Sequence, residues 1–293
     1  MGRVKNICKM SKLIGIITAW SAEPFIEPAI KQALDYCDEV LVSVSSHHPN
    51  LNKFEDNTMD ICMKYKNDIH LVGENVSNKQ MHGHSKGNIL KKMLDDTGNN
   101  KAGNWIGILD ADEFYYPEDI SSVRDIIKEN KFRRIQMPEK TFVVNTSNYA
   151  NWYRDRFKKI ISDNTTFWTN DMGYEKDDTP YVLKTDKGMH HYTFLMNPHF
   201  KRAFWTIEYG HPNQGNQPKK WGWIDNIYMD IDLNDQIKSV NKCKELGYGN
   251  SILGHFSFRC KDDGTLFTFD GEHPPHIEDS GLTKIEDFRT LYK

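Results

Sequence analysis

The sequence predicts an α/β fold, in which a mostly parallel central sheet is covered by helices on both faces. Three observations lead to this prediction. Short hydrophobic runs alternate with amphipathic segments over the N-terminal part of the chain, giving four strands separated by three helices. The runs are mostly apolar, which is typical of parallel strands buried on both faces. The chain has 293 residues, 38% of them hydrophobic, which is enough for a large core.

The four expected strands are residues 13–18, 39–44, 69–72 and 105–109. The three expected helices run from Glu23 onward, over residues 56–65 and over residues 85–94. Glu23 and Pro24 mark the first helix start, because proline and acidic residues are both favoured in a first helical turn. The third helix carries a single apolar stripe at helical period, made of Ile89, Leu90, Met93 and Leu94.

The second half of the chain is less regular. Pro117, followed by two acidic residues, predicts a further helix, and residues 133–137 and 141–144 are expected to form two separate strands. Residues 146–225 show no clear period, and residues 231–246 are expected to form a late helix that ends at Gly247. Since there is no Ser-, Pro- or Gly-rich linker, the sequence predicts one domain spanning residues 1–293.

Charge and cysteine content narrow the class of protein. The formal net charge is −3, so there is no global basic field to recruit nucleic acid. Five cysteines without a C-x-x-C pair argue against a disulfide framework or a zinc ribbon, and suit a reducing compartment. The chain contains no apolar stretch of membrane-spanning length, and residues 13–20 are too short for a signal peptide and lack a cleavage site. We therefore expect a cytoplasmic protein, or one peripheral to a membrane.

The fourth expected strand delivers three acidic residues, Asp110, Asp112 and Glu113, with only Ala111 between them. In an extended chain, residues two apart point the same way, so Asp110 and Asp112 are expected to face one ion. Carboxylates at a strand end lie where α/β sheets bind ligands, and Mg²⁺ and Mn²⁺ prefer such oxygen ligands. The alternative for a lone D-x-D pattern is a solvated acidic loop.

Residues 105–114 resemble the "W-I-x-x-L-D-A-D-E-F" segment of family 2-like glycosyltransferases, which have the GT-A fold. Further stretches are similar to elements of that family in the same order. They are residues 18–23 ("T-x-x-N-E"), 38–42 ("D-E-V-V-V"), 85–88 (an "R-N" pair), 191–194 ("H-Y-x-W/F") and 269–274 ("F-x-G-x-H-P"). Two positions depart from the pattern: Ser21 stands in place of Asn, and Ser45-Ser46 stand where the family often has Asp.

The resemblance implies a GT-A-like, Rossmann-related α/β/α sandwich with an irregular C-terminal half. Residues 10–120 would bind a nucleotide-diphosphate sugar, and residues 121–293 would bind the acceptor. Asp112 would bind Mn²⁺ or Mg²⁺ directly, whereas Asp110 would contact the donor ribose or reach the metal through water. His191 is expected as a further metal ligand, with His255 as the second choice.

The resemblance also implies the residues around the nucleotide. Thr18 and Ser45 would line the nucleoside pocket, and Lys86 and Asn88 would lie near the base or the diphosphate. His273-Pro-Pro-His276 is instead expected to cap the fold near the C-terminus.

The acceptor side offers candidates without a way to choose among them. The acceptor hydroxyl must lose its proton to a carboxylate or histidine within reach. Five acids could do this, with Asp225 favoured because of its aromatic surroundings: Glu113, Asp171, Glu175, Asp186 and Asp225. A short basic cluster is expected to be a solvated face, with an acceptor-phosphate contact as the alternative: Arg154, Arg156, Lys158 and Lys159.

The sequence thus predicts a metal-dependent glycosyltransferase that moves a sugar from a nucleotide-diphosphate sugar to a hydroxyl acceptor on a glycan or other glycoconjugate. By resemblance it would invert the anomeric configuration. Two alternatives from other classes stay open. One is a metal-dependent hydrolase of phosphoesters or glycosides, and the other is a non-catalytic module that binds sugar or nucleic acid. A transferase acting on nucleic acid is disfavoured by the slightly acidic charge.

Overall fold

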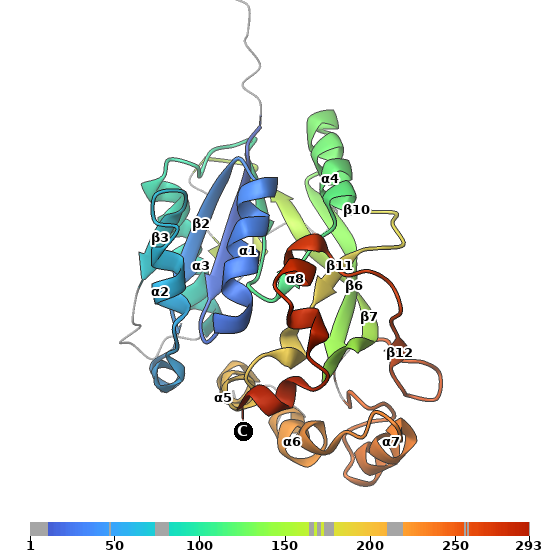
Figure 1. The fold of residues 1–293 in the computed structure, drawn as a ribbon. Coiled ribbons are helices and arrows are strands. Elements are labelled where there is room, and N and C mark those ends of the chain that lie inside the picture. Colours follow the sequence, from blue (N-terminus) through green and yellow to red (C-terminus); the bar gives the residue numbers. More distant parts are fainter. Residues whose placement is uncertain are drawn as a thin grey trace, which may run out of the picture.

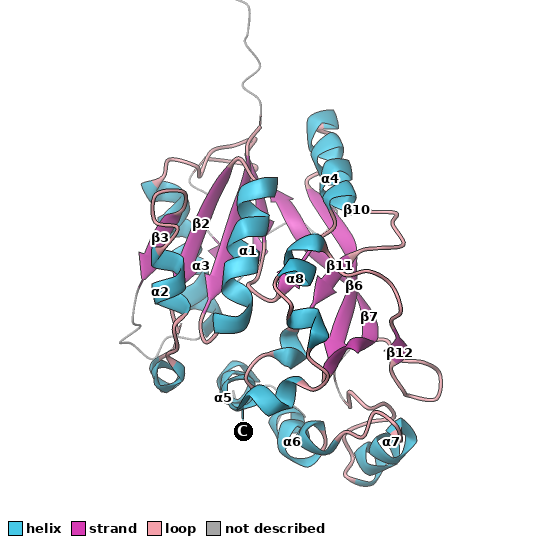
Figure 2. Cartoon of the chain, in the orientation of Figure 1, coloured by secondary structure: helices cyan, strands magenta, loops and turns pink. Residues whose placement is uncertain are grey.

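The computed structural model describes residues 11–46, 48–73, 82–163, 167–168, 171–172, 179–209, 219–254, 256 and 258–292. It confirms the predicted α/β class, with a central sheet between helices (Figures 1 and 2). Among these residues the main sheet has ten strands, eight of them in the order β3-β2-β1-β4-β7-β6-β11-β5. Within the same part of the chain, none of the helices combines the length and hydrophobicity needed to cross a bilayer.

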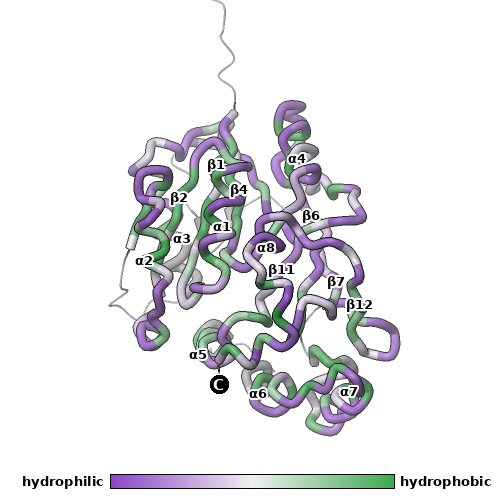
Figure 3. The backbone as a smooth tube through the Cα atoms, in the orientation of Figure 1, coloured by the Kyte–Doolittle hydropathy of each residue, from purple (hydrophilic) through white to green (hydrophobic). Residues whose placement is uncertain are grey.

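The N-terminal part of the sheet is parallel, as predicted. It consists of β1 (Leu13–Ala19), β2 (Glu39–Val44), β3 (His70–Gly73) and β4 (Trp105–Ile108). Strand β1 lies between β2 and β4, so that Ile16 pairs with Leu41 on one side and Ile108 on the other. The hydropathy drawing shows hydrophobic stretches along β1, β2 and β4, which is why these strands could be identified from sequence (Figure 3).

Alternate residues of these strands face two different helix layers. Leu13 and Ile17 pack into the core beneath helices α1 (Glu23–Tyr36) and α2 (Thr58–Met63). Ile14 and Ile16 join a second cluster with the apolar stripe of α3 (His82–Asp96). Because side chains alternate across a strand, this two-sided packing produces the expected α/β/α layers.

The rest of the sheet is largely antiparallel and corrects two predictions. Strand β6 (Arg134–Val143) is one continuous strand where two were expected. Strand β7 (Asn145–Lys159) pairs with both β6 and β4, although residues beyond Asn145 had been predicted to be irregular. Strand β6 also pairs with β11 (Met189–His191), which in turn pairs with β5 (Glu113–Phe114).

Buried charges explain both errors. Pro138-Glu139-Lys140 interrupt the apolar pattern of β6, yet Glu139 is 1% exposed and is paired with Arg154 of β7. On β7, Arg156 and Lys158 are buried as well, so the predicted solvated basic face is wrong for these two positions. A strand whose inward side chains are charged does not show the hydrophobic alternation on which strand prediction relies.

Shorter elements complete the described part of the chain. Helix α4 (Pro117–Glu129) begins at the predicted proline, whereas α7 (Gln236–Glu245) is shorter than predicted because the Asp235 side chain caps it at Lys238 N. The remaining elements are η1 (Pro49–Phe54), β8 (Phe167–Trp168), β9 (Asp171–Met172), β10 (Tyr181–Val182), η2 (Thr193–Leu195), α5 (Pro198–Tyr209), α6 (Lys219–Asn226), η3 (Tyr228–Asp230), β12 (Phe267–Thr268), α8 (Pro275–Asp279), η4 (Leu282–Lys284) and η5 (Phe288–Tyr292).

Candidate functional site

Thr18 and Asp110 meet at the carboxyl ends of two neighbouring parallel strands. Thr18 lies near the end of β1, and Asp110 follows β4. The Thr18 hydroxyl donates a hydrogen bond to Asp110 Oδ1 at 3.1 Å. Since β2 and β3 lie on one side of β1 and β4 on the other, the strand order reverses here, and such a reversal opens the ligand crevice of α/β sheets. The structure thus brings these two predicted residues together at the expected edge.

The acidic motif forms a turn between β4 and β5. Glu113 N donates to Asp110 O at 3.0 Å, so residues 110–113 form a turn and are not extended as the sequence argument assumed. The two carboxylates meet different partners. Asp110 contacts Thr18 and Arg156, whereas Asp112 lies beside His191 and Lys201. After Leu109 the chain therefore turns over residues 110–113, where β5 begins, instead of continuing β4.

Asp112 and His191 come together because β11 runs antiparallel to β5. In this register His191 pairs with Glu113, and Tyr192 N donates to Asp112 O at 2.8 Å. His191 Nε2 then lies 3.6 Å from Asp112 Oδ2. The two residues are 79 positions apart along the chain by their numbers, and both are buried. The structure therefore brings the two predicted metal ligands next to each other.

Glu139 fixes the orientation of His191. Its Oε1 lies 2.7 Å from His191 Nδ1, and its other oxygen pairs with Arg154. Burial would lower the pKa of His191, but Glu139 and then Asp112 raise it to about 9. For Asp112, burial alone would raise the pKa of the carboxyl group. The positive charges of Lys201 and His191 instead hold this pKa well below its usual range. A carboxylate that holds one ring nitrogen while the other faces a site is a common arrangement around metal ions.

Arg156 neutralises the charges of Asp110 and Glu113. It is 4% exposed, forms a buried ion pair with Glu113, and lies 3.4 Å from Asp110 Oδ2 through its Nη2. The second oxygen of Glu113 accepts a hydrogen bond from the Tyr115 hydroxyl at 3.2 Å. With both oxygens engaged and the side chain buried, Glu113 has the surroundings of a structural residue more than of the catalytic base it was proposed to be.

Lys201 reaches the site from the C-terminal half. Its Nζ lies 3.5 Å from Asp112 Oδ2 and donates to the Thr193 hydroxyl at 2.8 Å. Four acids thus face four basic groups at this edge: Asp110, Asp112, Glu113 and Glu139 against Arg154, Arg156, His191 and Lys201. Sequence reasoning missed the roles of Glu139, Arg156 and Lys201. For Arg156 the one local signal was the alternation of Arg154, Arg156 and Lys158, which is typical of a strand.

Gln32 holds the acidic turn in place from helix α1. It is fully buried, its amide donates to Glu113 O at 3.0 Å, and its carbonyl oxygen accepts from Tyr115 N at 2.6 Å. These two bonds satisfy the backbone of β5 on the side that faces α1. They hold the backbone at Glu113 and Tyr115 in place, and with it the position of Asp112 opposite His191.

We expect the substitution Gln32→Leu to lower the free energy of unfolding by about 1–3 kcal/mol, because it leaves a buried backbone donor and acceptor without partners. Urea denaturation measures this change. The neighbouring Lys31→Ala, at a half-exposed position of the same helix, should change stability by less than about 0.5 kcal/mol. Equal effects of the two substitutions would contradict the supporting role of Gln32.

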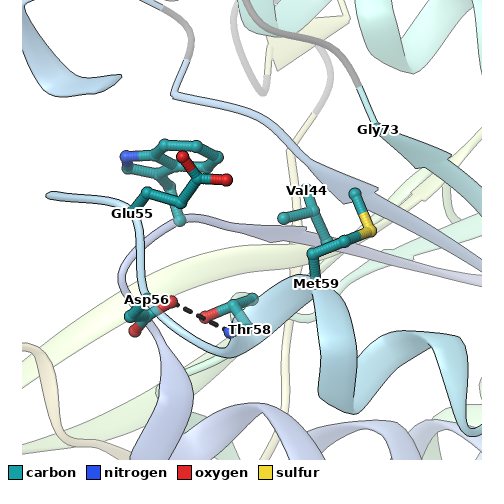
Figure 4. A pocket seen from close by; sticks show the side chains of 7 residues that line it. Val44, Glu55, Asp56, Thr58, Met59 and Gly73 are labelled. Atoms are coloured by element: carbon teal, nitrogen blue, oxygen red, sulfur yellow. Dashed lines mark hydrogen bonds between the residues drawn. The ribbon is translucent and has the colours of Figure 1, made fainter. Parts of the chain in front are cut away.

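A pocket opens at the carboxyl ends of β1, β2 and β3, where the chain leads into α2 (Figure 4). Its volume is about 180 Å³. Its floor comes from the ends of three parallel strands, and its rim from the segment that leads into α2. The lining residues are Trp20, Val44, Gly73, Glu55, Asp56, Thr58 and Met59. Asp56 accepts hydrogen bonds from Thr58 N and Glu23 N, both at 3.0 Å, so it fastens the starts of α2 and α1.

Comparison with known proteins gives no family assignment. No protein-family profile matches the chain, and no curated protein matches it. Among solved structures, a crystal structure of S. aureus TarS 1–349 shares 13% identity over 82% of this chain and 81% of that one, with a TM-score of 0.40. A 4-diphosphocytidyl-2C-methyl-D-erythritol synthase shares 13% identity over 60% of this chain and 90% of that one, with a TM-score of 0.37. Likenesses this distant identify neither a substrate nor a site residue.

The chemistry of the donor atoms decides whether a metal ion fits the site. In the ranges that the structure describes, no group of three or more His, Cys, Asp or Glu side chains is arranged to hold one. Asp112 and His191 supply one carboxylate and one oriented imidazole, ligands that suit Mn²⁺. Ions in phosphate sites are commonly held by one or two carboxylates, with substrate phosphates completing the shell. Such a pair therefore fits a divalent ion that arrives with a diphosphate.

The other predicted residues lie in varied surroundings. Ser45 is buried just after β2, where its N–H donates to Ala19 O at 3.1 Å. Asn88 is exposed on α3, and the side chain of Lys86 lies outside the described part of the structure. His255 also lies outside it. Asp225 is half-exposed on α6, and its Oδ2 pairs with Arg202 Nε at 2.9 Å.

The remaining acids proposed as bases, and the C-terminal histidines, can be placed in part. Asp186 is exposed, whereas the Asp171 side chain and Glu175 lie outside the described residues. His273 Nδ1 lies 2.8 Å from the Tyr192 hydroxyl, and His276 Nε2 lies 2.8 Å from Asp35 Oδ2 of α1. These contacts join the C-terminal segment to β11 and α1, which agrees with its expected capping role.

Proposed function

We propose that this protein is a metal-dependent glycosyltransferase that moves a sugar from a nucleotide-diphosphate sugar to a hydroxyl acceptor on a glycan or other glycoconjugate. One observation carries the proposal. Thr18, Asp110, Asp112 and His191 converge at the point where the order of the parallel strands reverses. This is the position at which α/β sheets bind nucleotides.

The two parts of the edge match the two parts of such a donor. The pocket formed by the ends of β1, β2 and β3 lies at the carboxyl edge of the parallel strands, and we assign it to the nucleoside. Asp112 and His191, across β1 from that pocket, are assigned to the metal ion and the diphosphate. This division of roles also follows the resemblance of residues 105–114 to glycosyltransferases.

The charge balance of the site supports an anionic ligand. Carboxylates alone would repel a diphosphate, but here the positive charge of Arg156 neutralises Asp110 and Glu113. Lys201 does the same for Asp112 from the side. The acids can therefore hold a divalent ion without presenting an excess of negative charge to the phosphates.

The proposed reaction needs few groups from the protein. The acceptor oxygen attacks the anomeric carbon, the bond from that carbon to the diphosphate oxygen breaks, and the diphosphate leaves with the bonding electrons. A single displacement of this kind inverts the anomeric configuration. A bound metal ion supplies neutralisation of the charge that grows on the diphosphate. Asp112 holds that position, Glu139 keeps His191 turned toward it, and a base takes the acceptor proton. Asp225 stays a candidate for that base.

Thermal-shift measurements test the function directly. We expect one of UDP, GDP, CDP or dTDP, or its sugar derivative, to stabilise the protein only when Mn²⁺ or Mg²⁺ is present. A ligand at one hundred times its dissociation constant adds about 2.7 kcal/mol to the free energy of unfolding, which is easily measured. The metal alone and the nucleotide alone serve as controls. Absence of stabilisation by every nucleotide, combined with phosphatase activity, would replace the proposal with the hydrolase alternative.

A further inference from the structure

Lys201 has a setting that differs from that of the other basic residues of the site. It follows Phe200, which is 6% exposed and packs edge-on against the Phe54 ring of η1 with centroids 5.8 Å apart. This contact joins α5 to the segment that follows β2, at the carboxyl edge of the sheet. The backbone of Lys201 is therefore fixed by the core, while its side chain reaches Asp112.

The side chain of Lys201 can still meet a ligand. It is 14% exposed, whereas the side chain of Arg156 is only 5% exposed. Its ammonium group has three N–H donors, and Thr193 and Asp112 account for two of them. Four methylene groups separate the charge from the backbone, so Nζ can move by a few ångströms while α5 stays in place.

Lys201 and a metal ion would compete for one oxygen. Asp112 Oδ2 lies 3.5 Å from Lys201 Nζ and 3.6 Å from His191 Nε2. A divalent ion between Asp112 and His191 would place two positive charges within a few ångströms of the ammonium group, and like charges at this distance repel strongly. The repulsion is removed if Lys201 turns to a new anionic partner at the same edge.

We propose that Lys201 is a diphosphate-binding residue that changes partner when the donor binds. This inference rests on the proposed function. In the empty site Lys201 is the counterion of Asp112. When the metal ion and the nucleotide bind, Asp112 would hold the ion, and Lys201 would bind a phosphate oxygen of the diphosphate. An ammonium group is a compact point charge that suits such a contact, and it also neutralises the charge of the leaving group.

If Lys201 exchanges Asp112 for a phosphate oxygen, Lys201→Gln should change the affinities for Mn²⁺ and for the nucleotide in opposite directions. Binding of Mn²⁺ alone should become tighter, since the competing cation is gone. Binding of the nucleoside diphosphate in saturating Mn²⁺ should become about 10- to 100-fold weaker, the loss expected for one hydrogen bond to a charged group. Lys201→Arg should restore part of the nucleotide affinity. A residue that only supported the fold would weaken both kinds of binding together.

Isothermal titration calorimetry tests the proposal with Mn²⁺ alone and with UDP, GDP, CDP and dTDP in saturating Mn²⁺. Lys128→Gln on α4 makes the same change of charge at a 73% exposed position and should behave as the unchanged protein. If Lys201→Gln binds the preferred nucleotide as tightly as the unchanged protein does, or binds Mn²⁺ more weakly, the role of Lys201 is overturned and the proposed function stands. If the unchanged protein binds none of the four nucleotides, the proposed function fails, and this inference fails with it.

Discussion

Replacing Asp112 by Asn should remove metal-dependent nucleotide binding and lower the transfer rate by about 10²- to 10³-fold. That loss corresponds to the several kcal/mol of charge stabilisation that a metal ion supplies. The amide keeps the shape of the side chain but carries no negative charge. His191 and Lys201 would then face a neutral group, and their positive charges would oppose a divalent ion. Thermal shifts with Mn²⁺ and the preferred nucleotide, and initial rates with its sugar derivative, measure the two effects.

A matched control separates this effect from a general loss of charge. Asp125 of α4 is 69% exposed and pairs with Lys128 at the surface, so Asp125→Asn should leave both measurements unchanged. The melting temperature without ligand shows whether the Asp112 variant is folded. A folded Asp112→Asn protein that still binds the nucleotide in a metal-dependent way would remove the assignment of the site, while the fold would be unaffected.

The parallel part of the fold could be predicted because its signals are local. Each of β1 to β4 is a short, mostly apolar run, and the helices between them carry their own start and stop residues. The antiparallel part is held together differently. In the β6–β7 register Glu139 pairs with Trp152, so Arg154 is its diagonal neighbour, and their ion pair stands where a hydrophobic contact would be expected. Such a pattern becomes visible only when the register is known.

The site shows the same division between local and long-range information. Thr18, Asp110 and Asp112 follow apolar strands, so their place at the sheet edge could be inferred from the sequence, and His191 from the resemblance. The ionic partners of these residues could not be inferred from the sequence. Arg156 is 43 residues from Glu113, and Lys201 is 89 residues from Asp112. Neither residue lies in a segment with a clear hydrophobic period. A charged residue in a polar segment is expected to be exposed, and only the fold shows that it is buried.

The buried Arg156, which pairs with Glu113 and Asp110, should also stabilise the fold around the acidic turn. We expect Arg156→Met to lower the free energy of unfolding by about 3–5 kcal/mol, the usual cost of leaving a buried charge without its partner. Glu113 has a fully buried side chain, and Asp110 would lose the same neighbour. Urea denaturation measures the change. Lys128→Met, at the surface of α4, should alter stability by less than about 0.5 kcal/mol.

The double variant Glu113→Gln with Arg156→Met decides whether the cost comes from the unpaired charge or from lost packing. Removing both charges should restore most of the stability, because a neutral amide can keep the hydrogen bond from the Tyr115 hydroxyl. If the double variant is as unstable as Arg156→Met alone, the loss comes from the packing of the arginine side chain, and the electrostatic account of the turn is wrong. If stability returns, Arg156 is the residue that allows Asp110 and Glu113 to lie together at the edge of the sheet, where a diphosphate would have to approach them.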